Sequence, residues 1–144
     1  MLLSSRGDKV MGLEFVGHAG VSNASFAKAD NAASVQDQLD AYFAGSLTEF
    51  SLTTELEGCT DFQLRVLREC SQVDYGERLT YGQLAQQIGT PGGARAVGNA
   101  LRTNPIALLI PCHRVTRADG SLGGYGGEDR QQRKKALLAL EATS

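Results

Sequence analysis

The sequence contains no long hydrophobic run. No apolar stretch in its 144 residues approaches the roughly 20 residues that a helix needs to cross a bilayer. Its first residues, Met1 to Arg6, lack the hydrophobic region of a secretory signal peptide. These absences argue against a membrane or secreted protein, and we expect a soluble, cytoplasmic one.

Cysteine and histidine are scarce. The cysteines Cys59, Cys70 and Cys112 are odd in number and form no C-x-x-C pair, which argues against a disulfide framework and a zinc knuckle. The only histidines are His18 and His113. We therefore expect no metal site.

The chain also lacks the net positive charge that is typical of nucleic-acid-binding proteins, since its net charge is −2. The charge is unevenly distributed, however. Residues 1–60 carry three basic and eight acidic side chains, whereas residues 61–144 carry eleven basic and eight acidic ones. Between Pro91 and Arg117 there are four arginines and no acid, which predicts a local basic surface that fits a DNA groove.

The N-terminal part predicts a small module of strands and one helix. Residues 2–3 and 10–16 predict two short strands that are joined by a turn at residues 6–8. Residues 19–33 are small and polar, which indicates a loop. A helix should follow Ser34, because apolar residues recur there at helical spacing, at Val35, Leu39, Tyr42 and Phe43. Residues 50–53 then predict a strand or an extended linker.

The C-terminal part predicts helices. Thr60 caps one that presents Phe62, Val66, Leu67 and Cys70 on one face, so Cys70 is expected in the core. Cys59 precedes this helix and is expected to be structural. Residues 81–88 and 94–103, separated by a glycine-rich break, have the pattern of a helix-turn-helix. A last helix is predicted from Glu128 to Ala142, with its basic residues Arg130, Arg133, Lys134 and Lys135 mostly solvated.

The most informative stretch surrounds Cys112. Residues 106–110 predict a buried extended run, which places Cys112 at the edge of something packed. A cysteine there can be a plain core residue, but the neighbouring His113 offers an imidazole that can generate the reactive thiolate. In an extended backbone the two side chains point to opposite faces, so a proton would pass through a bridging water or a local twist.

Four ordered motifs carry a family resemblance. Arg95-Ala96-Val97-Gly98-Asn99-Ala100, Asn104-Pro105, Pro111-Cys112-His113-Arg114-Val115 and Gly124-Tyr125 occur at compatible spacing, and together they resemble the O6-alkylguanine-DNA alkyltransferases. The match is strong from about residue 60 to 141 and loose before residue 57. It implies an α+β fold: a ribonuclease H-like module at residues 1–57, then a winged-helix-like DNA-binding domain with the helix-turn-helix at 58–144.

The resemblance implies a role for each matching residue. Cys112 would take the alkyl group from O6-alkylguanine irreversibly, once per molecule and with no cofactor, after the base is flipped out of double-stranded DNA. Glu141 would orient His113, which accepts the thiol proton through water, and Tyr81 would protonate the departing guanine. Non-catalytic explanations remain for two of these residues. A tyrosine that begins a helix, such as Tyr81, can be purely structural, and a glutamate near a helix end, such as Glu141, is commonly exposed to solvent.

The remaining roles concern the substrate and DNA, bound by a protein that we expect to act as a monomer. Arg95 matches the family's intercalating arginine finger, on a helix that enters the minor groove. Small residues in that helix also allow close helix packing, which is the simpler explanation. The other DNA-binding residues would be Ala96, Gly98 and Arg102, and the substrate-binding residues would be Tyr125, Val115, Asn104, Gly124 and Gly126.

The sequence departs from the family's pattern at the rim of the expected pocket. Gly126 replaces a small hydroxyl residue, and Glu128-Asp129 add acidic residues, so the tolerance for bulky alkyl groups is open. A lesion-binding protein of the alkyltransferase-like type, which lacks the nucleophile, is the main alternative. A helix-turn-helix regulator and a thiol hydrolase are others, but neither explains the combined motifs.

Overall fold

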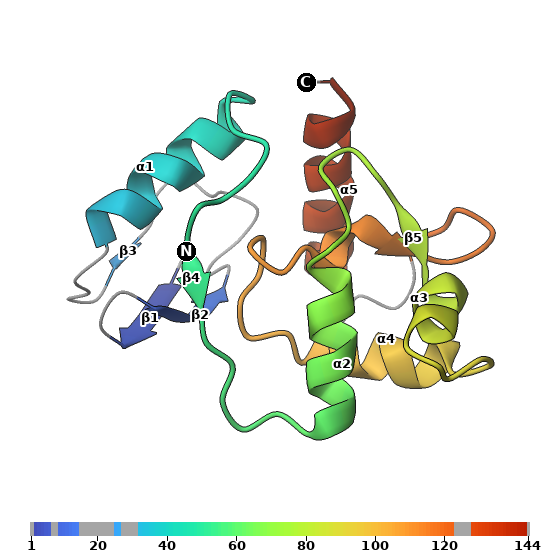
Figure 1. Cartoon of the computed structure of the whole chain (residues 1–144). Helices are drawn as coiled ribbons and strands as arrows, with labels where there is room; N and C mark the ends of the chain where they lie inside the picture. The colour runs from blue at the N-terminus through green and yellow to red at the C-terminus, as the bar shows by residue number, and fades with distance from the viewer. Residues whose placement is uncertain (1, 7–8, 15–24, 27–31, 123–127, 144) are drawn as a thin grey trace.

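The computed structural model describes residues 2–6, 9–14, 25–26, 32–122 and 128–143. It is a mixed structure of two small sheets and several helices (Figure 1). The smaller sheet pairs β5 (Leu79–Thr80) with β6 (Val115–Thr116) in parallel. Within these ranges, no helix is both long and apolar enough to span a membrane.

The N-terminal module is a four-stranded sheet with one helix. The strands β1 (Leu2–Arg6) and β2 (Lys9–Glu14) pair antiparallel and bring Arg6 opposite Lys9, so the predicted hairpin is confirmed, although residues 7–8 lie outside the described ranges. Two short strands complete the order β3-β1-β2-β4, namely β3 (Ser25–Phe26) and β4 (Thr53–Thr54). The strand β3 falls in a stretch that we predicted to be loop.

The helix of this module, α1 (Ala32–Phe43), begins three residues earlier than predicted. Its side chains Val35, Leu39 and Tyr42 are buried, as their helical spacing indicates. Figure 1 shows α1 running along one side of the sheet, with its C-terminal end turned toward the rest of the chain.

The C-terminal part contains the predicted helices α2 (Asp61–Cys70), α3 (Tyr81–Gln87), α4 (Ala94–Arg102) and α5 (Glu128–Thr143). Two of these helices begin with the same capping arrangement, formed by Thr60 and Gln63 in α2 and by Thr80 and Gln83 in α3. In each pair the threonine hydroxyl accepts from the backbone N–H of the glutamine, and the side-chain oxygen of the glutamine accepts from the backbone N–H of the threonine. The helices α3 and α4 pack against each other across a short turn (Figure 1). Cys70 is fully buried, as predicted.

The prediction of an extended run at residues 106–110 is wrong. The backbone forms tight turns there, with hydrogen bonds from the Ile110 N–H to the Ile106 carbonyl and from the Leu109 N–H to the Ala107 carbonyl. Leu108 is, in the described ranges, the one non-glycine residue with a left-handed backbone, at φ 71°. A continuous apolar run indicates burial but does not by itself distinguish a strand from a buried turn.

This buried turn also joins the two parts of the chain. The Leu13 N–H donates to the Pro105 carbonyl, and the Ala107 N–H donates to the Leu13 carbonyl, so β2 is hydrogen-bonded to the segment that leads to Cys112. Buried side chains of both parts, such as Val10 and Ile106, belong to one hydrophobic core. The sheet therefore helps to fix the segment that carries the cysteine.

The cap of α2 gives a test of how this helix is stabilised. Thr60→Ala removes the hydroxyl that accepts the Gln63 N–H at 3.1 Å, and we expect it to lower the free energy of unfolding by about 1 kcal/mol. Chemical denaturation measures this loss. Thr60→Ser keeps the hydroxyl and should remain within about 0.5 kcal/mol of the parent; equal losses in both variants would contradict the role of the cap.

Candidate active site

Cys112 begins a short 3-10 helix, η1 (Cys112–Arg114), directly after Pro111. Its side chain belongs to the core and is almost fully buried. The backbone is therefore not extended here, and of the two possibilities considered for the proton, a bridging water or a local twist, the structure contains a local twist. A 3-10 helix has about three residues per turn, so the two side chains leave the backbone about 120° apart.

His113 is buried against a carboxylate from the far end of the chain. Its Nε2 lies 2.6 Å from Oε2 of Glu141, on α5. Burial lowers the pKa of His113 from its ordinary value, although the hydrogen bond to Glu141 opposes this effect. The imidazole is therefore neutral at pH 7, and with Nε2–H donating to the carboxylate, Nδ1 is the nitrogen that can accept a proton.

Glu141 is the most heavily hydrogen-bonded carboxylate of the site. Oε2 also accepts from the Tyr42 hydroxyl at 2.6 Å and from Nη2 of Arg114 at 3.0 Å. Oε1 accepts from Nε of Arg114 at 2.8 Å and from the Gly76 N–H at 3.3 Å. Burial alone would raise the pKa of Glu141, but the hydrogen bonds from His113 and Arg114 outweigh it and hold this pKa far below its usual range.

Lys134 is a site residue that the sequence interpretation missed. We expected it to be solvated, but it is fully buried, with Nζ donating to the carbonyls of Val115 and Leu122 and lying 3.3 Å from the Tyr81 hydroxyl. Burial lowers its pKa to about 8, which the nearby Cys112 opposes. The missed signal was helical spacing: Lys134 precedes Leu138 by four residues and Glu141 by seven, so it faces the same way.

Tyr81 lies at the start of α3 beside this lysine. Its ring rests against the backbone of α4, where a side-chain carbon added at Gly98 would lie 3.7 Å from the ring. Burial, and then the neighbouring Cys112, raise the pKa of Tyr81, so its hydroxyl is protonated at neutral pH and can donate.

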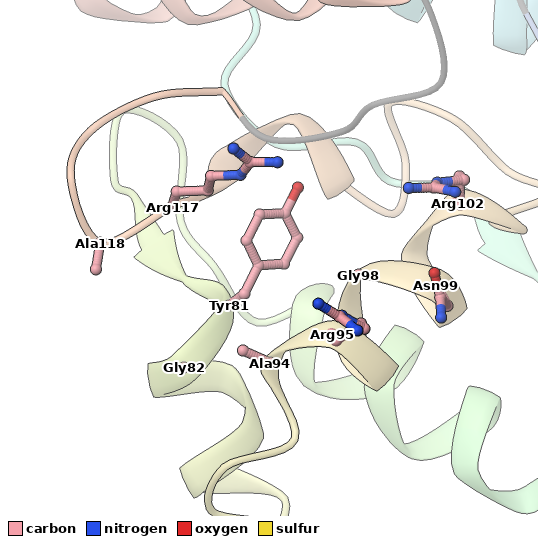
Figure 2. Close-up of a pocket in the computed structure, with 9 residues that line it drawn as sticks. All are labelled: Tyr81, Gly82, Ala94, Arg95, Gly98, Asn99, Arg102, Arg117 and Ala118. Carbon is pink, nitrogen blue, oxygen red and sulfur yellow. The ribbon is translucent and has the colours of Figure 1, made fainter.

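A pocket of about 430 Å³ opens beside Tyr81, between α3, α4 and the loop after strand β6 (Val115–Thr116). Figure 2 shows Arg95 and Arg102 on α4, with Arg117 across the pocket from them. No acidic side chain is among the described residues that line it, and three of them are arginines, so these residues give it a positive potential. Arg117 was not among the predicted site residues. The pocket is lined by Tyr81, Gly82, Ala94, Arg95, Gly98, Asn99, Arg102, Arg117 and Ala118.

The other predicted site residues are placed as follows. Asn104 braces the turn before Cys112: its amide donates to the Ile110 carbonyl at 2.9 Å, and its oxygen accepts the Ile106 N–H at 2.9 Å. Val115 is buried, and its carbonyl accepts from Lys134. Ala96 is exposed on α4. Gly124, Tyr125 and Gly126 lie outside the described residues.

Most of the chain is similar to known proteins of one family. Residues 61–143 match the family described as 6-O-methylguanine DNA methyltransferase, DNA binding domain. A methylated-DNA–protein-cysteine methyltransferase of Mycobacterium tuberculosis is 57% identical over 105 residues, which is 73% of this chain and 62% of the relative. The protein of the same name from Shigella flexneri is 42% identical over 78% of this chain and 65% of its own length. The chain thus spans less than two thirds of these relatives.

Solved structures agree with the family match. The Mycobacterium tuberculosis OGT in complex with DNA superimposes with a TM-score of 0.83, at 43% identity, over 98% of this chain and 85% of that one. The S. pombe Atl1 in complex with damaged DNA gives 0.52 at 31% identity, over 56% of this chain and 75% of that one. Because the family match covers more than half of the sequence, the chain belongs to the 6-O-methylguanine DNA methyltransferase family.

Proposed function

We propose that the chain is a DNA repair protein that transfers the alkyl group of O6-alkylguanine, mainly O6-methylguanine, to Cys112. The observation that supports this most directly is the buried series of Cys112, His113 and Glu141, with His113 and Glu141 2.6 Å apart. An alkyl carbon bound to sulfur as a thioether has no easy route of return, so each molecule reacts once. The reaction needs no cofactor, because the carbon passes directly from the base to the sulfur.

The residues divide the chemistry as follows. The neutral His113 accepts the Cys112 proton through a water molecule, and the sulfur then attacks the alkyl carbon as the carbon–O6 bond breaks. The Tyr81 hydroxyl supplies a proton to the departing guanine. Lys134, which lies 3.3 Å from that hydroxyl, stabilises the tyrosine oxygen while it lacks its proton.

Thiolate population cannot account for most of the acceleration. An ordinary cysteine is already a few per cent thiolate at pH 7, so complete ionisation increases the reactive form by only one to two orders of magnitude. Holding the sulfur in line with the alkyl carbon contributes more, roughly 7–11 kcal/mol in favourable cases. The bracing of the turn before Cys112 by Asn104 fits this requirement.

DNA would bind through α4 in the minor groove. The base that carries the lesion must leave the stack, which costs a few kcal/mol. Arg95, exposed at the start of α4, would fill the vacated stack, and Ala96 and Gly98 keep this helix slim. Arg102 and Arg117 add positive charge on both sides of the pocket (Figure 2).

The flipped guanine would bind near the segment that follows Leu122. Lys134 holds the carbonyls of Val115 and Leu122, which fixes the chain directly before that segment. By family resemblance, Tyr125 forms a flat wall for the purine, with Gly124 and Gly126 beside it. Backbone groups near Val115 read the purine edge.

The proposed function also implies a division of the chain into two domains. Residues 1–57 form a ribonuclease H-like module, and residues 58–144 a winged-helix-like domain whose helix-turn-helix is α3 and α4. One chain carries every group that the reaction needs, which supports action as a monomer. A free nucleophilic thiol also suits the reducing cytoplasm.

Lesion binding without transfer is the second candidate. The similarity to the S. pombe Atl1, whose complex contains O6-carboxymethylguanine, favours it. Cys112 favours transfer, because the alternative class lacks this nucleophile.

Intact-mass analysis separates these two functions. After the protein is mixed with a duplex that contains O6-methylguanine, intact-mass analysis should show a gain of one CH2 unit, located at Cys112 by peptide mapping. Cys112→Ala should show no gain. Binding to the lesion without a mass change would favour the lesion-binding function, and indifference to the lesion would contradict both.

A further prediction concerns Arg95. Arg95→Ala should slow transfer from duplex DNA by roughly ten- to a hundredfold, since it removes part of the compensation for a flipping cost of a few kcal/mol. Reaction with the free base O6-methylguanine should change by less than about threefold, because no base has to be flipped. Single-turnover rates measure both effects.

The matched control for this variant is Arg68→Ala, which removes an exposed arginine of α2 that does not line the pocket. It should leave both rates near those of the parent. Equal slowing of Arg95→Ala on duplex and on the free base would count against a role in flipping.

A further inference from the structure

A buried tyrosine of the N-terminal module reaches the proposed active site. Tyr42 lies in the last turns of α1 and is 1% exposed. Its ring packs against Phe43, Phe50 and Tyr75, with ring centroids 5.3 to 6.0 Å apart. Beyond this cluster, its hydroxyl donates to Oε2 of Glu141 at 2.6 Å, across 99 residues of sequence.

The hydrogen bond from Tyr42 to Glu141 requires the hydroxyl group of Tyr42. Oε2 of Glu141 is the same oxygen that meets Nε2 of His113, so any change in its charge or position acts on the imidazole directly. A phenylalanine would fill the same space in the aromatic cluster, whereas only a hydroxyl can donate to the carboxylate. Burial and the hydrogen bond to Glu141 raise the pKa of Tyr42, which keeps this hydroxyl a donor.

We propose that Tyr42 is a positioning residue, through which the N-terminal module holds Glu141 in the state that keeps His113 a neutral base for Cys112. This inference rests on the proposed function for its consequence, but the hydrogen bond itself does not. It gives α1 a role in the chemistry beyond packing.

The direction of the effect follows from the charges around His113. Glu141 favours the protonated imidazole, while burial and the positive charges of Arg114 and Lys134 oppose it. Tyr42 withdraws electron density from the carboxylate and weakens the attraction of Glu141 for the imidazolium. Without the Tyr42 hydroxyl, the pKa of His113 should rise, and the acidic limb of the pH–rate profile should move to higher pH.

Tyr42→Phe in the full chain tests this. On the acidic limb of the pH–rate profile, single-turnover transfer should be up to about tenfold slower than in the parent, and at pH 8 it should be within about twofold of it, since one pKa unit changes the neutral fraction up to tenfold. Tyr75→Phe is the matched control, because it removes a hydroxyl from the same aromatic cluster and leaves the bond from Tyr42 to Glu141 in place.

An NMR titration of the imidazole nitrogens gives a second readout without DNA. His113 should titrate at higher pH in Tyr42→Phe than in the parent, and Tyr75→Phe should leave it unchanged. Replacing Tyr42 by 3,5-difluorotyrosine keeps the hydroxyl but makes it a stronger donor, so His113 should then titrate at lower pH. If Tyr42→Phe does not fold, the 3,5-difluorotyrosine variant still tests whether the Tyr42 hydroxyl sets the titration of His113.

The two readouts separate this inference from the proposed function. A titration of His113 that does not respond to either change at Tyr42 overturns the positioning role, even if methyl transfer occurs. A protein that transfers no methyl group but shows both shifts in titration keeps the role of Tyr42 and loses the function.

Discussion

The structure around Cys112 depends on the burial of one carboxylate. Glu141 is almost inaccessible to water, and an isolated charge at such a position would cost several kcal/mol. Five hydrogen bonds compensate for the lost water, and they come from α1, from the turn at Gly76 and from η1. The carboxylate can therefore be buried only when these segments, distant in sequence, are already in place.

Because of this requirement, the geometry of the candidate site depends on contacts between distant parts of the fold, and Arg114 makes several of them. Arg114 binds both oxygens of Glu141 and donates to the Val73 carbonyl, so it connects α5 to the chain that follows α2. Its guanidinium also lies 5.6 Å from the centre of the Tyr75 ring. A side chain that the sequence presents only as the neighbour of His113 thus fixes both the histidine's partner and the aromatic cluster behind it.

Local signals in the sequence predicted most of the helices and much of the candidate site. Capping threonines and apolar spacing placed α2, α3 and α4 to within one or two residues, because these features are encoded by neighbours in the chain. The family resemblance drew attention to Cys112, His113 and Glu141, and the structure brings the last two together.

Features that depend on distant partners were not predictable in the same way. The turn at Leu108 was mistaken for an extended run, because its shape depends on the hydrogen bonds of Asn104 and on pairing with β2. The hydroxyl of Tyr42 carried no sign of its partner, since a tyrosine in an apolar stripe has the same spacing whether it only packs or also donates.

The inner face of α5 shows why a charged helix was easily misjudged. Most of its basic residues suggested a solvated surface, yet Lys134 and Glu141 are both buried, two turns apart, with Leu137 and Leu138 between them. Each of these two charges has its own polar partners: Lys134 the carbonyls of Val115 and Leu122, and Glu141 the donors around His113. Polar contacts that require a unique partner specify position more narrowly than apolar packing does. The register of α5, and with it the position of Glu141 relative to His113, is therefore set at both ends of this face by hydrogen bonds, while the two leucines supply the packing between them.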